Sequence, residues 1–397
     1  MINRYLHEDI KRNFSIATIW INGGSEMDSE SKKGLNQILC SLLTRGCEGF
    51  DNLALSDYIE TYGAELNHEV IEDGISISIK SLNCYFNKIY PLIDLIINKP
   101  SLSEIEFQKV KKSTINLIKK EKENPFNISF EKWRKIVYSR HAYAFNSIGY
   151  EKDVSEITYK DVLLEYEKFK SRKKYLISNN LKVNGNFLEV LNQKTFRALS
   201  IPNYYLNKEN RFISSNNKSN QTIIMLGNQT CSRKNIEYLP LKVLESYLSY
   251  GMSSVLFKIF REKNGITYDV GVFNPVRKEN APFLVYLSVS NKNATLAFKL
   301  LSELWKELLF SLIPDEEIRL AKEKLKSSIL LSNQTLEEIL QRKIQLISYG
   351  ISPYSSKDYF SKIEEISPEF IKEIFNKYFA KPFLSITGDK KICLEIK

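Results

Sequence analysis

A short amphipathic helix is predicted by the stretch that reads Gly34-Leu35-Asn36-Gln37-Ile38-Leu39-Cys40-Ser41-Leu42-Leu43-Thr44-Arg45-Gly46. Its leucines and isoleucine recur at the spacing of one helical face, and a glycine stands at either end. Gln37, Cys40 and Ser41 follow one another at i, i+3 and i+4, which predicts that their side chains share the other face. The chemistry of that face therefore decides the function of the chain.

The residues on both sides of this helix follow a known pattern. Trp20 to Glu26 is similar to W-x-x-x-G-S-x-x-E, and Gly34-Leu35 to the start of G-L-x-H-x-x-E-H. Arg45-Gly46 is similar to the K/R-G that follows this motif. The sequence thus resembles the half-length branch of the pitrilysin/insulinase family of zinc metallopeptidases, which are inverted zincins. In that family the two histidines bind zinc and the glutamate is the base.

All three functional positions of the motif depart from the family pattern. Gln37 and Ser41 stand in place of the histidines, and Cys40 stands in place of the glutamate. The resemblance therefore implies a non-catalytic member, with no catalytic residue, metal ligand or cofactor in this chain.

The third zinc ligand of the family is a glutamate on a later helix. A charged helix is predicted from about residue 103 to 123, with Ser103 and Glu106 as its capping pair. Alignment on Glu123-Asn124-Pro125, which resembles the family's ending of this segment, places the ligand position at Asn116 or Leu117. Neither side chain can replace a carboxylate on zinc.

The second half of the chain keeps another family segment. The stretch from Tyr250 to Gly271 resembles G-x-S-S-R-L-F-x-x-[IL]-R-E-x-x-G-L-[AT]-Y-x-V, with a departure at Val255. In active members the arginine and the tyrosine seven residues later hold the substrate, and Arg261 and Tyr268 match both types and the spacing. Guanidinium and phenol groups can donate to a peptide carbonyl or to an oxyanion. Without the resemblance, Arg261 is better interpreted as a helix-end cation and Tyr268 as an ordinary strand residue.

The composition indicates a globular protein. The 397 residues, 43% of them hydrophobic, suffice for two domains with a core each. The formal charge of +10 comes from basic residues interleaved with acidic ones, which argues against nucleic acid as a partner. The N-terminus carries charges where a signal peptide needs its apolar core, and no apolar run approaches membrane-spanning length. We expect a soluble cytoplasmic protein with no membrane partner.

The cysteines agree with a reducing compartment, because they are odd in number and scattered: Cys40, Cys47, Cys84, Cys231 and Cys393. A zinc site at Cys40 and Cys47 would lack a C-x-x-C pair, so isolated buried thiols are favoured. Only three histidines are present, and we interpret His68 and His141 as structural hydrogen-bonding residues.

The order of predicted elements is similar in the two halves of the chain. The first half has a strand at 14–21, a helix at 51–62, an alternating strand within 66–82, and strands at 175–177 and 183–187. The second half has strands at 222–227 and 283–289 and helices at 239–260 and 294–312. With the resemblance, this implies an α+β fold of two similar α/β-roll domains, each a mixed sheet covered by helices, forming half of a clamshell. The domains are expected at 1–199 and 222–397, joined by an Asn- and Ser-rich linker at 200–221.

The resemblance implies a function within a pair of chains. We expect the zinc-free subunit of a heterodimeric metallopeptidase, which helps a zinc-bearing homologous partner to bind an extended peptide or small unfolded polypeptide. On its own the chain is expected to have no peptidase activity. A first alternative is a non-proteolytic scaffold or core subunit. A second is a hydrolase with Cys40 as nucleophile, which lacks a histidine nearby in the sequence.

Overall fold

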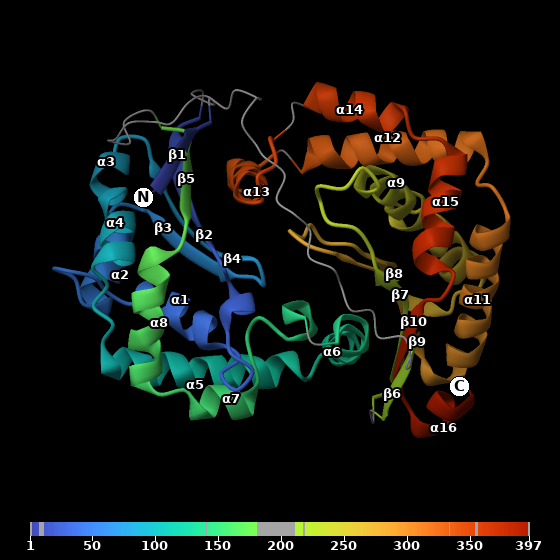
Figure 1. Ribbon diagram of the computed structural model, residues 1–397, viewed down its shortest axis with the longest axis horizontal. Helices are drawn as coiled ribbons and strands as arrows, with labels where there is room; N and C mark the ends of the chain where they lie inside the picture. The colour runs from blue at the N-terminus through green and yellow to red at the C-terminus, as the bar shows by residue number, and fades with distance from the viewer. Residues whose placement is uncertain are drawn as a thin grey trace. The chain divides into compact units, whose positions relative to one another are not determined.

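The computed structural model describes residues 2–7, 12–139, 141–180, 211–216, 219–332, 334–353 and 356–395. The chain forms two compact units (Figure 1). Unit 1 comprises the described residues within Met1–Lys120, Phe145–Ser200 and Ser332–Pro353, and unit 2 those within Glu121–Ala144, Ile201–Leu331 and Tyr354–Lys397. Among the residues described, no helix is both long and apolar enough to cross a membrane.

Unit 1 is built on a mixed sheet with the strand order β1-β5-β2-β4-β3. The strands are β1 (Ile2–Leu6), β2 (Phe14–Asn22), β3 (Glu65–Val70), β4 (Gly74–Leu82) and β5 (Lys174–Ser178). β1 pairs with β5 in parallel, and the remaining neighbours are antiparallel. β2 is buried on both faces, which explains its almost unbroken apolar sequence.

Helices cover both faces of this sheet. Alternate residues of β2 and β4, such as Ile19 and Ile77, pack into a core with α1 (Leu35–Leu43), α4 (Pro91–Asn98), α5 (Glu104–Glu121) and α8 (Tyr159–Ser171). The shorter elements of the unit are η1 (Ser25–Met27), α2 (Asn52–Thr61), α3 (Phe86–Ile89) and α7 (Glu151–Glu156). The opposite face is covered by α13 (Leu336–Ser348), whose neighbouring residue Tyr349 lies edge-on to the ring of Trp20.

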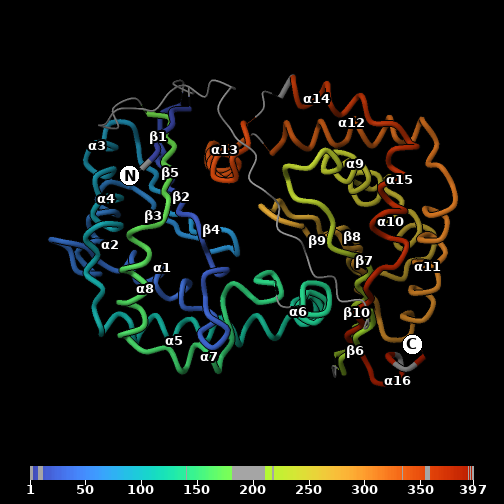
Figure 2. The backbone as a smooth tube through the Cα atoms, viewed as in Figure 1, coloured from blue at the N-terminus to red at the C-terminus, as the bar shows by residue number. Residues whose placement is uncertain are grey.

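Unit 2 repeats this plan with the strand order β6-β10-β7-β9-β8. The strands are β6 (Phe212–Asn216), β7 (Gln221–Gln229), β8 (Thr267–Phe273), β9 (Pro282–Ser290) and β10 (Phe383–Gly388). The outer pair β6–β10 is parallel and the other pairs are antiparallel, as in unit 1. Figure 2 allows the path of the backbone through each sheet to be followed.

The core of unit 2 lies between its sheet and α9 (Tyr238–Ser249), α11 (Ala294–Phe310), α12 (Asp315–Leu331) and α15 (Pro368–Phe379). The opposite face carries α6 (Pro125–Tyr138), which is followed by η2 (Ala142–Ala144). The remaining elements are α10 (Val255–Phe257), the π-helical turn η3 (Lys258–Lys263), η4 (Asn291–Asn293), α14 (Ser356–Glu364) and α16 (Lys390–Glu395). The equal strand orders of the two units confirm the expected fold of two similar mixed sheets covered by helices.

Each unit contains one helix that comes from the other half of the sequence. α6 precedes α8 in the chain but packs in unit 2, where Trp133 Nε1 donates to the carbonyl of Phe383 at 3.2 Å. α13 lies late in the chain but packs in unit 1, where Tyr349 donates to Asp73 Oδ2 at 2.6 Å. The compact units therefore differ from the contiguous ranges 1–199 and 222–397. Residues 200–210, 217 and 218 of the expected linker lie outside the described residues. The linker prediction was wrong for Phe212–Asn216, which form strand β6 and pair with β10.

Most strands and helices expected from periodicity are present, with one correction. The helix expected at 239–260 is interrupted: α9 ends at Ser249, Tyr250 is extended, and α10 begins at Val255. Gly251 has φ +76°, a conformation that glycine adopts without strain and that ends the first helix. The strand expected at 183–187 lies outside the described residues.

Candidate functional site

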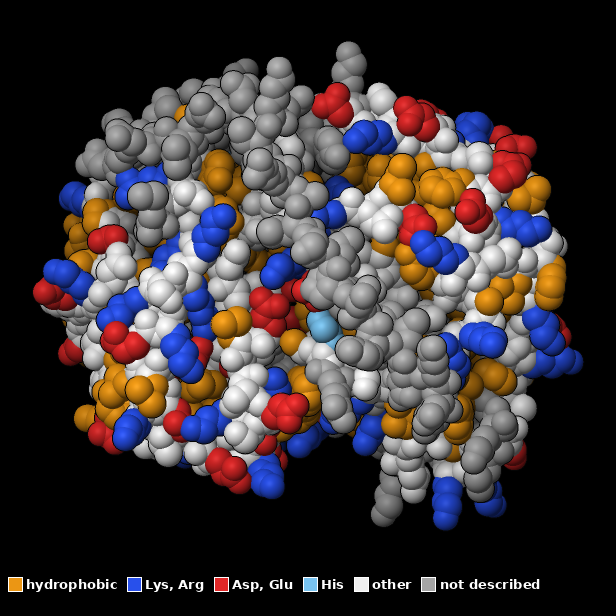
Figure 3. All heavy atoms as spheres, viewed as in Figure 1, with side chains coloured by type: hydrophobic (Ala, Val, Ile, Leu, Met, Phe, Trp, Pro, Cys, Tyr) orange, Lys and Arg blue, Asp and Glu red, His pale blue; other side chains and the backbone are white. Residues whose placement is uncertain are grey.

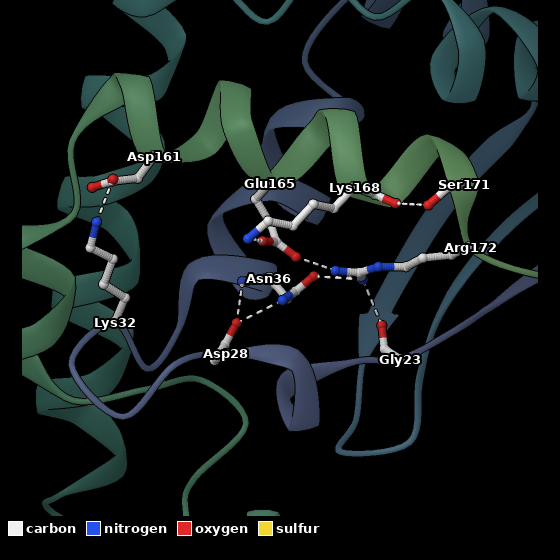
Figure 4. A network of polar contacts seen from close by, with 9 residues as sticks. All are labelled: Gly23, Asp28, Lys32, Asn36, Asp161, Glu165, Lys168, Ser171 and Arg172. Atoms are coloured by element: carbon white, nitrogen blue, oxygen red, sulfur yellow. Dashed lines mark hydrogen bonds and ion pairs between the residues drawn. The ribbon is translucent and has the colours of Figure 1, made fainter.

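The helix α1 carries the three motif positions, and the carboxylate of Asp28 fixes its N-terminus (Figure 4). Asp28 accepts hydrogen bonds from Gly34 N at 2.8 Å, from Asn36 N at 2.9 Å and from Asn36 Nδ2 at 2.7 Å. The two backbone donors are groups that the first turn of a helix leaves without an intrahelical partner. Burial raises the pKa of Asp28 to about 6, although the bonds from Asn36 and Gly34 and the charge of Lys33 act in the other direction.

A buried arginine ties this N-terminus to the rest of unit 1. Arg172 Nη1 donates to the carbonyl of Gly23 at 2.7 Å and to Asn36 Oδ1 at 2.8 Å, and the guanidinium pairs with Glu165 of α8. Figure 4 shows this chain of contacts running from Asp28 through Asn36 to α8. The direction of α1 is thereby set by the end of β2 and by α8.

Two glycines allow the backbone to cross closely at the start of α1. Gly34 has φ +101° and Gly149 has φ +91°. A Cβ on Gly149 would lie 2.2 Å from the carbonyl oxygen of Lys33 and 2.6 Å from the Cα of Gly34. Any larger residue at position 149 would therefore displace α1.

The two half-buried motif positions of α1, Gln37 and Ser41, form a polar chain with a histidine of β3. Gln37 Nε2 donates to Ser41 Oγ at 3.3 Å, and Ser41 Oγ lies 3.2 Å from His68 Nε2. The other ring nitrogen of His68 is 3.4 Å from Thr44 Oγ1. Burial, together with the positive charge of Arg45, lowers the pKa of His68 and favours the neutral imidazole.

Cys40 does not share this polar face, so its expected orientation was wrong. Its side chain is fully buried in the apolar core of unit 1, beside residues such as Ile38 and Leu39. Burial strongly raises the pKa of the Cys40 thiol, which keeps it protonated. A buried neutral thiol is a poor nucleophile, which argues against the hydrolase alternative.

Arg261 and Tyr268 lie on neighbouring elements of unit 2, and both are exposed. Arg261 belongs to η3, with its guanidinium carbon 5.3 Å from the ring centroid of Phe257. Tyr268 is 65% exposed and stands in the terminal strand β8, where the register with β9 shifts between Thr267 and Asp269. Both side chains are therefore accessible to solvent.

Comparison with known proteins decides the family. The sequence profile described as "Insulinase (Peptidase family M16)" matches residues 5–149, and the profile described as "Peptidase M16 inactive domain" matches residues 187–325. The two matched ranges together span more than half of the chain. This chain belongs to the insulinase family, M16.

Similar proteins cover nearly the full length of this family member. An "Uncharacterized zinc protease" of Rickettsia felis is 24% identical over 91% of this chain and 86% of its own length. A "Non-peptidase homolog YmxG" of Helicobacter pylori is 19% identical over 89% of this chain and 82% of its own length. The crystal structure of a peptidase M16 inactive domain from Pseudomonas fluorescens superposes with a TM-score of 0.81 at 19% identity, over 98% of this chain and 95% of the other.

The zinc positions of the insulinase family do not carry a zinc-binding set in this chain. Gln37 and Ser41 offer only neutral oxygen and nitrogen atoms, and Asn116 and Leu117 are exposed on α5 without a carboxylate. His68 adds one imidazole, whereas zinc sites use three or four imidazole, thiolate or carboxylate ligands. Among the described residues, no group of three or more His, Cys, Asp or Glu side chains is arranged to hold a metal. This chain is an inactive-type homologue of the insulinase family.

His141 has a structural environment, as the sequence suggested. Its Nε2 lies 2.7 Å from Glu279 Oε2, and its Nδ1 accepts from the backbone N–H of Tyr143 at 3.2 Å. The ring thus joins η2 to the segment before β9 in unit 2.

Asp28 was missed as a positioning residue, although the sequence carries a signal for it. Position 28 is where the acidic residue falls when W-x-x-x-G-S-x-x-E is counted from Trp20. The same count would have identified the N-terminal anchor of α1.

We expect Gly149→Ala to destabilise the protein by about 3 kcal/mol, because both the left-handed conformation and the contact with Lys33 oppose a Cβ. Gly63→Ala is the matched control: Gly63 also has positive φ, but no atom lies within 4 Å of its added Cβ, so a loss of about 1 kcal/mol is expected. Urea unfolding monitored by circular dichroism gives the free energy of unfolding of both variants and of the wild type. Equal losses of stability in the two variants would contradict the close approach of the backbone at Gly149 to that at Lys33 and Gly34.

We expect the stability advantage of the wild type over Asp28→Asn to shrink as the pH rises. The folded-state pKa of Asp28, about 6, lies above the ordinary 3.8, so its contribution is fully present below about pH 4 and lost as the pH passes about 6. The difference in unfolding free energy between the two proteins should fall by up to about 3 kcal/mol between pH 4 and pH 7.5. If the difference in unfolding free energy stays constant or grows over this range, burial does not raise the pKa of Asp28.

We expect Cys84 and Cys40 to differ in their rate of alkylation in the native protein. Cys84 is exposed and should react with iodoacetamide within minutes, whereas the buried, protonated Cys40 should stay unlabelled until the protein unfolds. Peptide mass spectrometry after labelling with and without urea gives the result. Labelling of native Cys40 at the rate of Cys84 would restore it as a candidate nucleophile.

Proposed function

We propose that this chain is the zinc-free subunit of a two-chain cytoplasmic metallopeptidase, and that it helps a zinc-bearing homologous partner to bind its substrate. The observation that carries the proposal is the contrast between two family segments. Gln37 and Ser41 stand where the zinc-binding imidazoles are required and Cys40 where the basic carboxylate is required, while Arg261 and Tyr268 keep the residue types and spacing of the substrate-holding pair. Loss of one function with retention of the other fits a subunit that binds without cleaving.

The chemistry of the retained pair suits a peptide substrate. A guanidinium and a phenol both donate hydrogen bonds to a peptide carbonyl, and an arginine also stabilises an oxyanion as it forms. Arg261 lies on η3, and π-helical turns of this kind are frequent at functional sites. The exposure of both side chains leaves their donors available to a ligand.

The ends of the two sheets offer a way to hold an extended chain. β3 and β8 are terminal strands of their sheets, and a peptide can add to such an edge by backbone hydrogen bonds. Several side chains of β3 are exposed, among them Glu65 and Glu69. An extended peptide or small unfolded polypeptide can add to a sheet edge in this way, because its backbone groups are not already paired.

The catalytic zinc, its water and the general base would come from the partner subunit. A cytoplasmic location is supported by the five cysteines, all of which are free. On the face that Figure 3 shows, basic and acidic side chains are interspersed, which favours a polypeptide partner over nucleic acid.

Reconstitution with a zinc-bearing homologue encoded in the same genome tests this proposal. Peptide cleavage by the mixture should fall by roughly tenfold to a hundredfold with Arg261→Ala, because a donor to the oxyanion is lost. Tyr268→Phe should give a smaller loss. Assembly, followed by size-exclusion chromatography, should be unchanged in both.

Arg319→Ala is the matched control, since Arg319 is an exposed helical arginine of unit 2 that pairs with Glu316. Turnover in this variant should equal that of the wild type. If Arg261→Ala and Arg319→Ala are equally active while assembly persists, the pair is not a substrate contact. The chain would then be a scaffold or core subunit.

A further inference from the structure

The histidine that a nucleophile at Cys40 would need lies beside Ser41 instead. Ser41 Oγ is 3.2 Å from His68 Nε2 in unit 1, where α1 packs against β3 (Figure 1). A serine hydroxyl within hydrogen-bond reach of an imidazole nitrogen is the arrangement of a nucleophile and its base. Neither side chain belongs to the buried core of unit 1, so a small molecule can reach both.

The hydrogen bonds around the ring of His68 fix which of its nitrogens carries the proton. Thr44 Oγ1 donates its only hydrogen to the carbonyl of Ser41 at 3.0 Å. Its lone pairs are then left to accept at the 3.4 Å contact with His68 Nδ1. In the neutral ring Nδ1 therefore carries the hydrogen, and the free lone pair is on Nε2, which faces the hydroxyl of Ser41.

Gln37 sets the direction of the remaining hydrogen bond. Its Nε2 donates to Ser41 Oγ at 3.3 Å, which leaves the hydroxyl hydrogen of Ser41 to be donated to His68. The proton of Ser41 is thus directed at a base. The same amide is a donor close to Oγ, within reach of an oxyanion that forms when this oxygen attacks a carbonyl group.

We propose that Ser41 and His68 form a nucleophile–base pair that hydrolyses small esters with a good leaving group, and that Thr44 is the positioning residue of the imidazole. Cys40 takes no part in this reaction, since it lies in the core. The activity does not rest on the proposed role in a metallopeptidase, because it needs neither zinc nor a second chain.

The reaction consumes only the ester and water. Ser41 Oγ forms a bond with the acyl carbon while its proton passes to His68 Nε2. The bond from the acyl carbon to the leaving-group oxygen then breaks, and the imidazolium gives the proton to that oxygen. Water next attacks the acyl group on Ser41, and His68 moves a proton from the water to Ser41 Oγ. The carboxylic acid leaves and both side chains return to their starting states.

The neutral partner of His68 favours esters over peptides. Thr44 offers a hydroxyl and not a carboxylate, so the imidazolium is stabilised less than in a Ser-His-Asp triad. Burial and the positive charge of Arg45, which lower the pKa of His68, act in the same direction. Such an imidazole is neutral at pH 7 but only a weak base, so the leaving group must depart readily, as that of an activated ester does.

The test uses 4-nitrophenyl acetate and the full chain. The wild type should release 4-nitrophenolate at least about tenfold faster than Ser41→Ala, because this variant lacks the nucleophile. His68→Gln should lose about as much, since glutamine is polar but cannot take up the proton. Thr44→Val should lower the rate by about threefold to tenfold, and Thr44→Ser, which keeps the hydroxyl, should restore it. Circular dichroism checks that each variant is folded.

Ser56→Ala is the matched control and should react at the wild-type rate. Ser56 is an exposed helical serine of unit 1 that donates to the backbone carbonyl of Asn52 at 3.0 Å. Diisopropyl fluorophosphate locates the nucleophile: Ser41 Oγ should bond to phosphorus with loss of fluoride in the native protein but not in urea, as peptide mass spectrometry detects. Equal rates in the wild type, Ser41→Ala and His68→Gln, or a native protein whose Ser41 stays unmodified, would overturn the proposal.

Discussion

The position of α1 depends on the buried contacts at its N-terminus. Asp28 accepts from the first turn, Arg172 joins Asn36 to the end of β2, and Glu165 of α8 holds the guanidinium. A carboxylate at a helix N-terminus and a paired buried arginine are each favourable only when all partners are present. These contacts are all made by side chains and backbone groups of unit 1, so they orient the helix whichever residues occupy the motif positions.

The residues at the three motif positions of α1 cannot bind zinc, but each of them fits its surroundings. Gln37 and Ser41 satisfy each other and His68 in a neutral chain of hydrogen bonds, and Cys40 fills the apolar core. A zinc ion would require charged or imidazole donors at these places. The second family segment keeps the family's residue types, and its Arg261 and Tyr268 are exposed, so a ligand can reach them. The proposed division of labour between two chains would account for both observations.

The sequence predicted the parts of the fold that are encoded by local periodicity. β2 and β7 were expected from short runs rich in apolar and β-branched residues, and α1 and α11 from apolar residues at the helical period. β3 was missed because its sequence, Glu65 to Val70, is largely polar and it is a terminal strand with one exposed edge. The exchange of α6 and α13 could not be predicted, because an amphipathic helix does not encode which sheet it covers.

The same limit applied to the site. Spacing placed Cys40 with Gln37 and Ser41, but α1 is buried around most of its circumference, so only a narrow strip remains polar. His68 is distant from Ser41 in sequence, and the hairpin of β3 and β4 brings it to α1.

The central claim is that α1 lacks the donors needed to hold zinc. It is tested most directly by dialysing the purified chain against zinc and counting bound metal by native mass spectrometry, beside a Ser41→Ala/His68→Ala variant. The account predicts that the two proteins retain the same low amount of zinc, with no stoichiometric ion in either. Stoichiometric zinc in the wild type that is absent from the variant would show that this helix still binds the metal.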